Sequence, residues 1–81
     1  MNNVYHVTTS KKLEKYKSTG VILSPVRYWT TLYSARKWAK KTGRNIILTF
    51  IEPKRSYPLP IKYGAKWSDE LVRTWEIILE A

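Results

Sequence analysis

Cysteine is absent from this chain of 81 residues. Disulfide bonds, zinc sites with cysteine ligands and thiol catalysis are therefore excluded. A domain of this size buries only about 60 to 65 % of the surface that its unfolded chain exposes, so its stability depends on large apolar side chains. Four Trp, six Tyr and one Phe supply them. We expect a single compact domain over residues 1–81.

Glycine and histidine are also scarce. Gly20, Gly43 and Gly64 are the only glycines and stand far apart, which excludes a glycine-rich phosphate loop of the Walker or dinucleotide type. His6 is the only histidine, and the six scattered carboxylates give it no metal-ligand spacing. No serine lies in the strand–turn–helix setting of a hydrolase nucleophile. We expect neither a metal site nor a Ser-His-Asp triad.

Long apolar runs are missing as well. No segment approaches the roughly 18 apolar residues that a membrane-spanning helix needs. The first residues lack the basic start and apolar run of a secretory signal. The sequence predicts a soluble, cytoplasmic protein with no membrane partner.

Acidic residues are absent from one long stretch. From Lys15 to Ile51 the chain has eight Lys or Arg residues and no Asp or Glu, and the whole chain carries a net charge of +9. An uncompensated positive field disfavours the compact state through self-repulsion. We therefore expect an anionic ligand, which could be NAD, RNA or DNA, or an acidic protein partner. A basic surface that serves only solubility is the alternative.

Patterning and capping residues predict the order strand, helix, strand, helix, strand, with a further strand at the C-terminus. Ser10 is a candidate N-cap for the first helix and Thr30 or Thr31 for the second, while Gly20 and Gly43 are suited to end them. The expected strands are 4–9, 21–23, 45–52 and 74–79, and the expected helices are 11–19 and 32–42. The fold class is α+β.

Residues 45–52 are apolar on both faces, which predicts a central strand. Residues 21–23 form either a short buried strand or an extended segment, and the proline-limited stretch 54–60 is either a loop or an edge strand. Residues 67–70 resemble a helix start, but we interpret them as a short turn before the terminal strand.

His6 lies inside the first expected strand. With a side-chain period of two, it shares a face with Val4 and Thr8 and points away from Tyr5 and Val7. A buried histidine hydrogen-bonded to backbone is one interpretation of this position. A ligand-binding histidine is the other.

The segment Tyr5-His6-Val7-Thr8-Thr9 resembles the first-strand Tyr-His-Gly-Thr or His-Gly-Ser motif of the ADP-ribosyltransferase-like superfamily, which includes poly-ADP-ribose polymerases and RNA 2′-phosphotransferases. After this segment come an expected helix and then the segment Gly20-Val21-Ile22, in the same order as in the family. The segment 27–31 then resembles the family's aromatic strand, with Trp38 soon after it. Glu76 occupies a place comparable to that of the family's strand glutamate.

The resemblance covers about three-quarters of the chain and implies a minimal or degenerate member with a split sheet. It implies a protein that binds NAD or an RNA end and that could transfer ADP-ribose. The catalytic pair would be His6, bonded to a ribose 2′-hydroxyl, and Glu76, bound to the ribose and stabilising oxocarbenium-like charge. Val7 departs from the family's glycine. The cofactor-binding residues would be His6, Tyr28 and Trp38 for the nicotinamide riboside, and Arg27 and Arg44 for the pyrophosphate.

Each of these residues also has a structural interpretation. Trp38 stands at helical spacing with Leu32, Ala35 and Ala39, as a core residue would. Glu76 would lie on the solvent face of a terminal strand. Tyr28 would be an edge aromatic.

A second hypothesis makes the protein a non-enzymatic nucleic-acid binder or an inhibitor of phage or mobile-element type. One helix face would contact phosphates, while Tyr28, Trp29 and Tyr33 could stack on unpaired bases. The same face would suit an acidic groove on a protein. Its residues are Arg36, Lys37, Lys40, Lys41 and Arg44.

Overall fold

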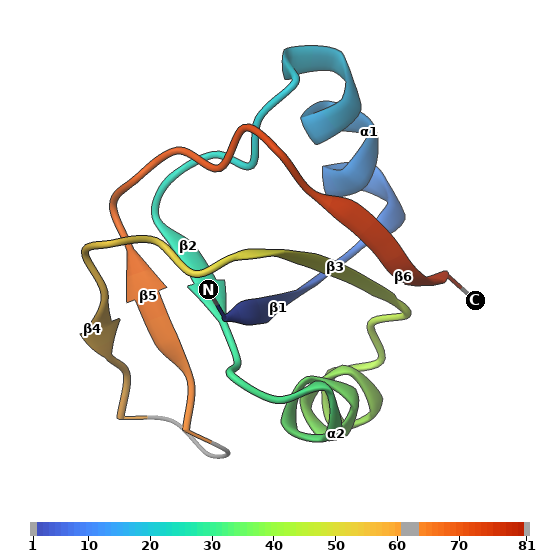
Figure 1. Cartoon of the computed structure of the whole chain (residues 1–81). Helices are drawn as coiled ribbons and strands as arrows, with labels where there is room; N and C mark the ends of the chain where they lie inside the picture. The colour runs from blue at the N-terminus through green and yellow to red at the C-terminus, as the bar shows by residue number, and fades with distance from the viewer. Residues whose placement is uncertain (1, 61–63, 81) are drawn as a thin grey trace.

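The computed structural model describes residues 2–60 and 64–80. They form a small α+β fold, as expected, with two helices and six strands (Figure 1). The helices are α1 (Ser10–Thr19) and α2 (Leu32–Thr42), and the strands are β1 (Asn3–Thr8), β2 (Val26–Tyr28), β3 (Ile46–Ile51), β4 (Tyr57–Pro58), β5 (Lys66–Ser68) and β6 (Glu76–Glu80).

The strands form two antiparallel sheets of three. The first has the order β1-β3-β6 and the second the order β2-β5-β4. The central place of β3 confirms the prediction made from its apolar residues on both faces. A backbone bridge joins the sheets where the Tyr5 amide donates to the Trp29 carbonyl at 2.9 Å and the Trp29 amide to the Tyr5 carbonyl at 2.8 Å.

The side chains of β1 alternate between two faces, as predicted, and each face packs in a different hydrophobic cluster. Val4 packs in one cluster with Leu13 and Tyr16 of α1. Val7 packs in the other with Ala35 and Ala39 of α2. Figure 1 accordingly shows α1 and α2 at different sides of the first sheet. Each helix packs against the sheet with a narrow apolar stripe. Basic residues on its other faces are exposed to solvent.

Both helices have the predicted bounds to within one residue, but the first cap differs from the expected one. Thr9, not Ser10, is the N-cap of α1, because its hydroxyl accepts from the Lys12 amide at 3.3 Å. Thr31 caps α2. Gly20 ends α1 with a φ of 78°, a left-handed conformation that glycine adopts without strain.

The second sheet was the harder part to predict. The interpretation of 67–70 as a turn is wrong for its first two residues, since β5 pairs with β2. Residues 21–23 are extended, and Ile22 forms only an isolated bridge with Val72. Strands of two or three residues are too short for a periodic signal, and their pairing partners lie far along the chain.

Candidate functional site

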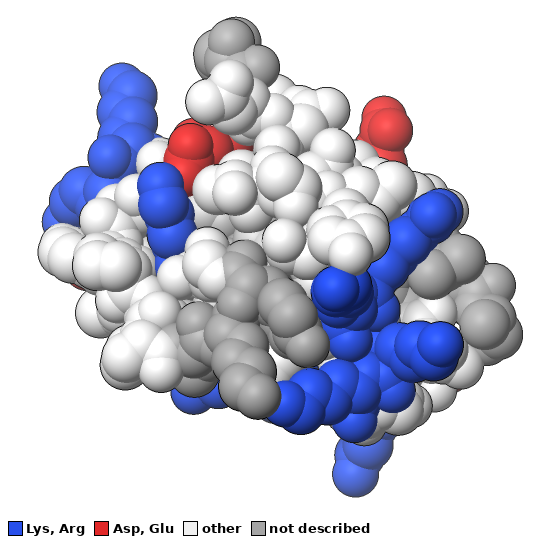
Figure 2. All heavy atoms as spheres, turned by 90° about the horizontal axis from the view of Figure 1, so that it is seen from below, with Lys and Arg blue, Asp and Glu red and all other residues white. Residues whose placement is uncertain are grey.

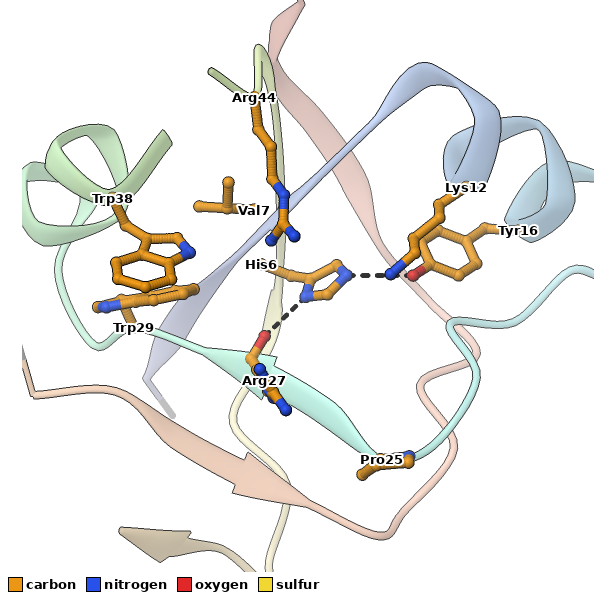
Figure 3. A pocket seen from close by; sticks show the side chains of 9 residues that line it. All are labelled: His6, Val7, Lys12, Tyr16, Pro25, Arg27, Trp29, Trp38 and Arg44. Carbon is orange, nitrogen blue, oxygen red and sulfur yellow. Dashed lines mark hydrogen bonds between the residues drawn. The ribbon is translucent and has the colours of Figure 1, made fainter. Parts of the chain in front are cut away.

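A cavity of about 260 Å³ opens between α1, the start of β2, the end of α2 and the middle of β1. Figure 3 shows Trp29 and Trp38 on one side of His6, with Lys12 and Tyr16 on the other. We call this cavity the His6 pocket. Its lining residues are His6, Val7, Lys12, Tyr16, Pro25, Arg27, Trp29, Trp38 and Arg44.

Local structure explains why the basic residues converge on His6. The Thr9 cap starts α1 so that Lys12 and Tyr16, four residues apart, share the helix face above the pocket. Arg44 follows the glycine cap of α2, and its amide donates to the Ala39 carbonyl at 2.9 Å, which fixes the direction in which the chain leaves the helix. Arg27 is the exposed residue of β2, between two buried ones.

Two hydrogen bonds hold the His6 ring. Its Nδ1 lies 2.6 Å from the Arg27 carbonyl oxygen and its Nε2 lies 3.2 Å from the Tyr16 hydroxyl (Figure 3). A carbonyl only accepts, so Nδ1 carries the proton and donates. In a neutral ring Nε2 is then an acceptor, and the Tyr16 hydroxyl donates to it.

The surroundings of His6 keep its ring neutral. The pKa of His6 is lowered from 6.5 to about 4, chiefly by burial and also by the positive charges of Lys12 and Arg44, while the bond to the Arg27 carbonyl opposes the shift. His6 is only 9 % exposed. At neutral pH the ring is therefore a fixed, uncharged polar group and not a cation.

Three cations surround this neutral ring. Lys12, Arg27 and Arg44 are exposed, and no Asp or Glu is among the described residues that line the pocket. The two ion pairs found in the described part of the chain lie elsewhere, between Arg55 and Asp69 and between Lys66 and Glu52. The pocket thus has an uncompensated positive potential that favours an anion.

Aromatic rings form the other wall. The ring centroids of Trp38 and Trp29 lie 5.6 Å apart with planes inclined by 30°. Trp29 is 2 % exposed, whereas Trp38 is half-buried and packs against the same cluster as Ala35. The core and site interpretations of Trp38 therefore describe one side chain, with one part of it in the core and another at the pocket.

Tyr28 does not reach the pocket. Its side chain is fully buried, its ring meets Phe50 edge-on at 5.8 Å, and its hydroxyl donates to Glu52 at 3.1 Å. Because side chains alternate along a strand, Tyr28 points into the core when its neighbour Arg27 points outward. The edge-aromatic interpretation does not describe this position either.

Glu76 lies apart from His6. It pairs with Thr49 of β3, which pairs with Tyr5 of β1, and residues in one cross-strand row share a face. His6 follows Tyr5 and so points to the opposite face. Glu76 is exposed beside a separate depression lined by Asn3, Thr49, Phe50, Ile51, Thr74 and Trp75.

The basic helix face predicted from the sequence is exposed on α2. Figure 2 shows Lys and Arg side chains gathered on the side of the molecule that α2 occupies at the bottom of Figure 1. Lys37 also lies over the Tyr33 ring, 4.7 Å from its centroid. Arg44 belongs to both this face and the His6 pocket. The other residues of the face are Arg36, Lys37, Lys40 and Lys41, all exposed.

Five pocket residues were missing from the sequence-based site, and one of them, Val7, had been noted only as a departure from the family's glycine. The spacing of Lys12 and Tyr16 behind a capped helix start was a usable signal, because it places both beside the end of β1. Trp29 had been considered only as a base-stacking residue of the alternative. Pro25 gave no signal.

Among residues 2–60 and 64–80, no three His, Asp or Glu side chains cluster as metal ligands would. Neither described helix is long and apolar enough to cross a membrane. Comparisons with models of known protein families, with curated proteins and with solved structures find no match to this chain.

Proposed function

We propose that this protein binds a phosphate-bearing nucleotide, either NAD or an RNA end, in the His6 pocket. The observation that carries the proposal is the group of three cations around a neutral, buried histidine, next to an indole ring and without a lining carboxylate. A nucleotide offers a matching set of groups, since it combines phosphate charge, sugar hydroxyls and an aromatic base.

Each part of the pocket has a role in this binding. The guanidinium groups of Arg27 and Arg44 can each donate two parallel hydrogen bonds to a phosphate, and Lys12 adds a third positive charge. Both ring nitrogens of His6 are already bonded, so the Tyr16 hydroxyl oxygen, whose proton is donated to His6, is the atom of this pair that can accept from a sugar hydroxyl. Trp38 supplies a ring face for the base.

The resemblance to the ADP-ribosyltransferase-like superfamily supports NAD as one candidate ligand. Two sheets joined at the Tyr5 and Trp29 bridge are compatible with the family's split sheet. Transfer of ADP-ribose through Glu76 has no support in this geometry, because that carboxylate lies beside another depression and faces away from His6. We therefore propose binding without assigning a catalytic step.

The test compares paired substitutions that remove one positive charge inside or outside the pocket. Lys12→Gln and Arg44→Gln are expected to weaken binding of NAD or AMP by about tenfold to a hundredfold, as a lost hydrogen bond to a charged group does. Lys15→Gln on α1 and Arg36→Gln on α2 are the controls. Binding is measured by titration with tryptophan fluorescence.

Equal effects of the pocket and control substitutions would show that only net charge matters and would overturn the proposal. The absence of saturable binding of NAD, AMP and a phosphorylated oligonucleotide would also overturn it.

A second candidate function is non-enzymatic binding of DNA or RNA through α2. The observation that favours it is the gathering of basic side chains in Figure 2. Five phosphate contacts would make log affinity fall with log salt at a slope of about −4.5 on duplex DNA or about −3.5 on single strands. A salt-independent affinity would contradict this candidate. Capture of a protein that survives nuclease treatment would instead indicate the acidic-partner alternative.

A further inference from the structure

The His6 pocket is too small for a complete dinucleotide. Its volume of about 260 Å³ lies below the roughly 300 to 1,000 Å³ of pockets that enclose drug-sized ligands. It can hold a sugar phosphate or one base, but the rest of a longer ligand must lie outside it. The surface next to the pocket therefore decides what the second half of such a ligand contacts.

A second depression adjoins the pocket at Arg27. It has a volume of about 230 Å³ and is lined by Pro25, Arg27, Leu59 and Trp67. Pro25 and Arg27 also line the His6 pocket. The two depressions are thus neighbours, and the Arg27 side chain lies at their boundary.

Strand register explains how Trp67 comes to lie beside Arg27. Arg27 of β2 pairs with Trp67 of β5, which pairs with Tyr57 of β4. The three side chains form one cross-strand row on the same face of the second sheet. Ser68, the next residue of β5, is fully buried on the opposite face.

The Trp67 ring lines the second depression and is backed by the Tyr57 ring, which does not line it. Their centroids lie 4.7 Å apart and their planes are inclined by 32°. Tyr57 is 41 % exposed and Trp67 is half-buried. The face of Trp67 that is turned away from Tyr57 can accept a stacked base, because every base has a π-face.

We propose that Trp67 and Leu59 form a second base-binding subsite, and that the ligand is a dinucleotide whose linking phosphate is bound by Arg27. This inference rests on the proposed nucleotide binding at His6. The ligand's two bases would stack on Trp38 and Trp67, and its linking phosphate would bind the Arg27 guanidinium between them. NAD and an RNA dinucleotide share this chemistry.

The aromatic ring of Trp67 favours a nucleotide over an acidic peptide at this row. Among described residues, the lining of the second depression contains an arginine and no carboxylate. An acidic peptide would satisfy Arg27 but would gain little from the Trp67 ring face, whereas a base stacks on it. The subsite is therefore assigned to the base of the second nucleotide.

The experiment measures the affinities of AMP, NAD and 5′-phosphorylated diadenylate for the wild-type protein and for Trp67→Leu. A stacked second base is expected to make at least one dinucleotide bind roughly 5- to 150-fold more tightly than AMP. Trp67→Leu is expected to remove this gain and leave AMP affinity unchanged. Trp67→Phe keeps an aromatic face and is expected to retain most of it.

Tyr33→Leu is the matched control, since it removes an exposed ring of α2 that lines neither depression. Unchanged AMP affinity in Trp67→Leu also reports that the variant is folded. Which dinucleotide gains affinity identifies the source of the second base.

If AMP binds but neither dinucleotide binds more tightly, or if Tyr33→Leu removes the gain and Trp67→Leu does not, the subsite is refuted while binding at His6 stands. If AMP, NAD and diadenylate all fail to bind, both proposals are overturned.

Discussion

His6 and Glu76 lie on the same sheet, yet their surroundings differ in burial, charge and bonding. His6 is buried, is held by two hydrogen bonds and is surrounded by Lys12, Arg27 and Arg44. Glu76 is exposed on β6, an outer strand of the sheet. The difference arises from register, because the row of Tyr5 and Glu76 is next to the row of His6 and faces the other way.

The comparison shows how little a motif's order along the chain says about a shared cleft. A shift of one residue in the pairing of a strand moves all its side chains to the other face. A strand glutamate can therefore occur at the expected point of the sequence and still point away from the histidine.

The largest expected effect comes from the wall of the His6 pocket. Trp29 lines the pocket but is also a core residue, at 2 % exposed. Trp29→Ala should lower the free energy of unfolding by about 3 to 5 kcal/mol, as deletion of a buried aromatic ring does. Ile77→Ala on β6, where the residue is 37 % exposed, should cost only about 1 kcal/mol. Urea unfolding measures both, and equal losses would contradict the contrast between the two regions.

A smaller effect is expected on the stability of the folded protein at acidic pH. The folded state lowers the pKa of His6 from 6.5 to about 4, so the folded protein binds fewer protons than the unfolded chain between these values. The free energy of unfolding should be fully retained above pH 6.5 and should fall by about 3 kcal/mol as the pH decreases to 4.

The variant His6→Asn isolates this contribution, since an amide can still donate to the Arg27 carbonyl but does not titrate. Urea unfolding at pH 7 and pH 4.5 should show a smaller acid-induced loss in the variant than in the wild type. Identical losses would exclude His6 as the group responsible.

The smallest effect is expected at Glu76. Because its side chain is exposed, Glu76→Gln should change the free energy of unfolding by less than about 0.5 kcal/mol. It should also leave NAD and AMP affinity unchanged, in contrast to Arg44→Gln. A loss of NAD affinity or of any NAD turnover in Glu76→Gln would instead place this carboxylate in the site and favour the transferase interpretation.

The sequence was sufficient for the elements with a strong local signal. The two helices have caps and apolar stripes, and β3 has a long apolar run, so their bounds and the central position of β3 were predictable. The face of His6 followed from alternation in β1. The short strands β4 and β5 form through pairing between distant segments, which local pattern does not encode.

The site was predictable only in part for the same reason. His6, Trp38, Arg27 and Arg44 were named from the sequence and do line one pocket. Tyr28 was placed in the site because the sequence did not show which residues of β2 point into the core. Glu76 was placed there because the register of β6 against β3 was unknown.

The backbone and the side chain of Arg27 have two different roles. Its backbone oxygen fixes the proton on His6, while its side chain faces the boundary of the two depressions. Every amino acid has that oxygen, so exchange of the side chain leaves the histidine's proton where it is. Substitutions at position 27, by mutation or by evolution, can consequently change ligand preference without changing the protonation of His6.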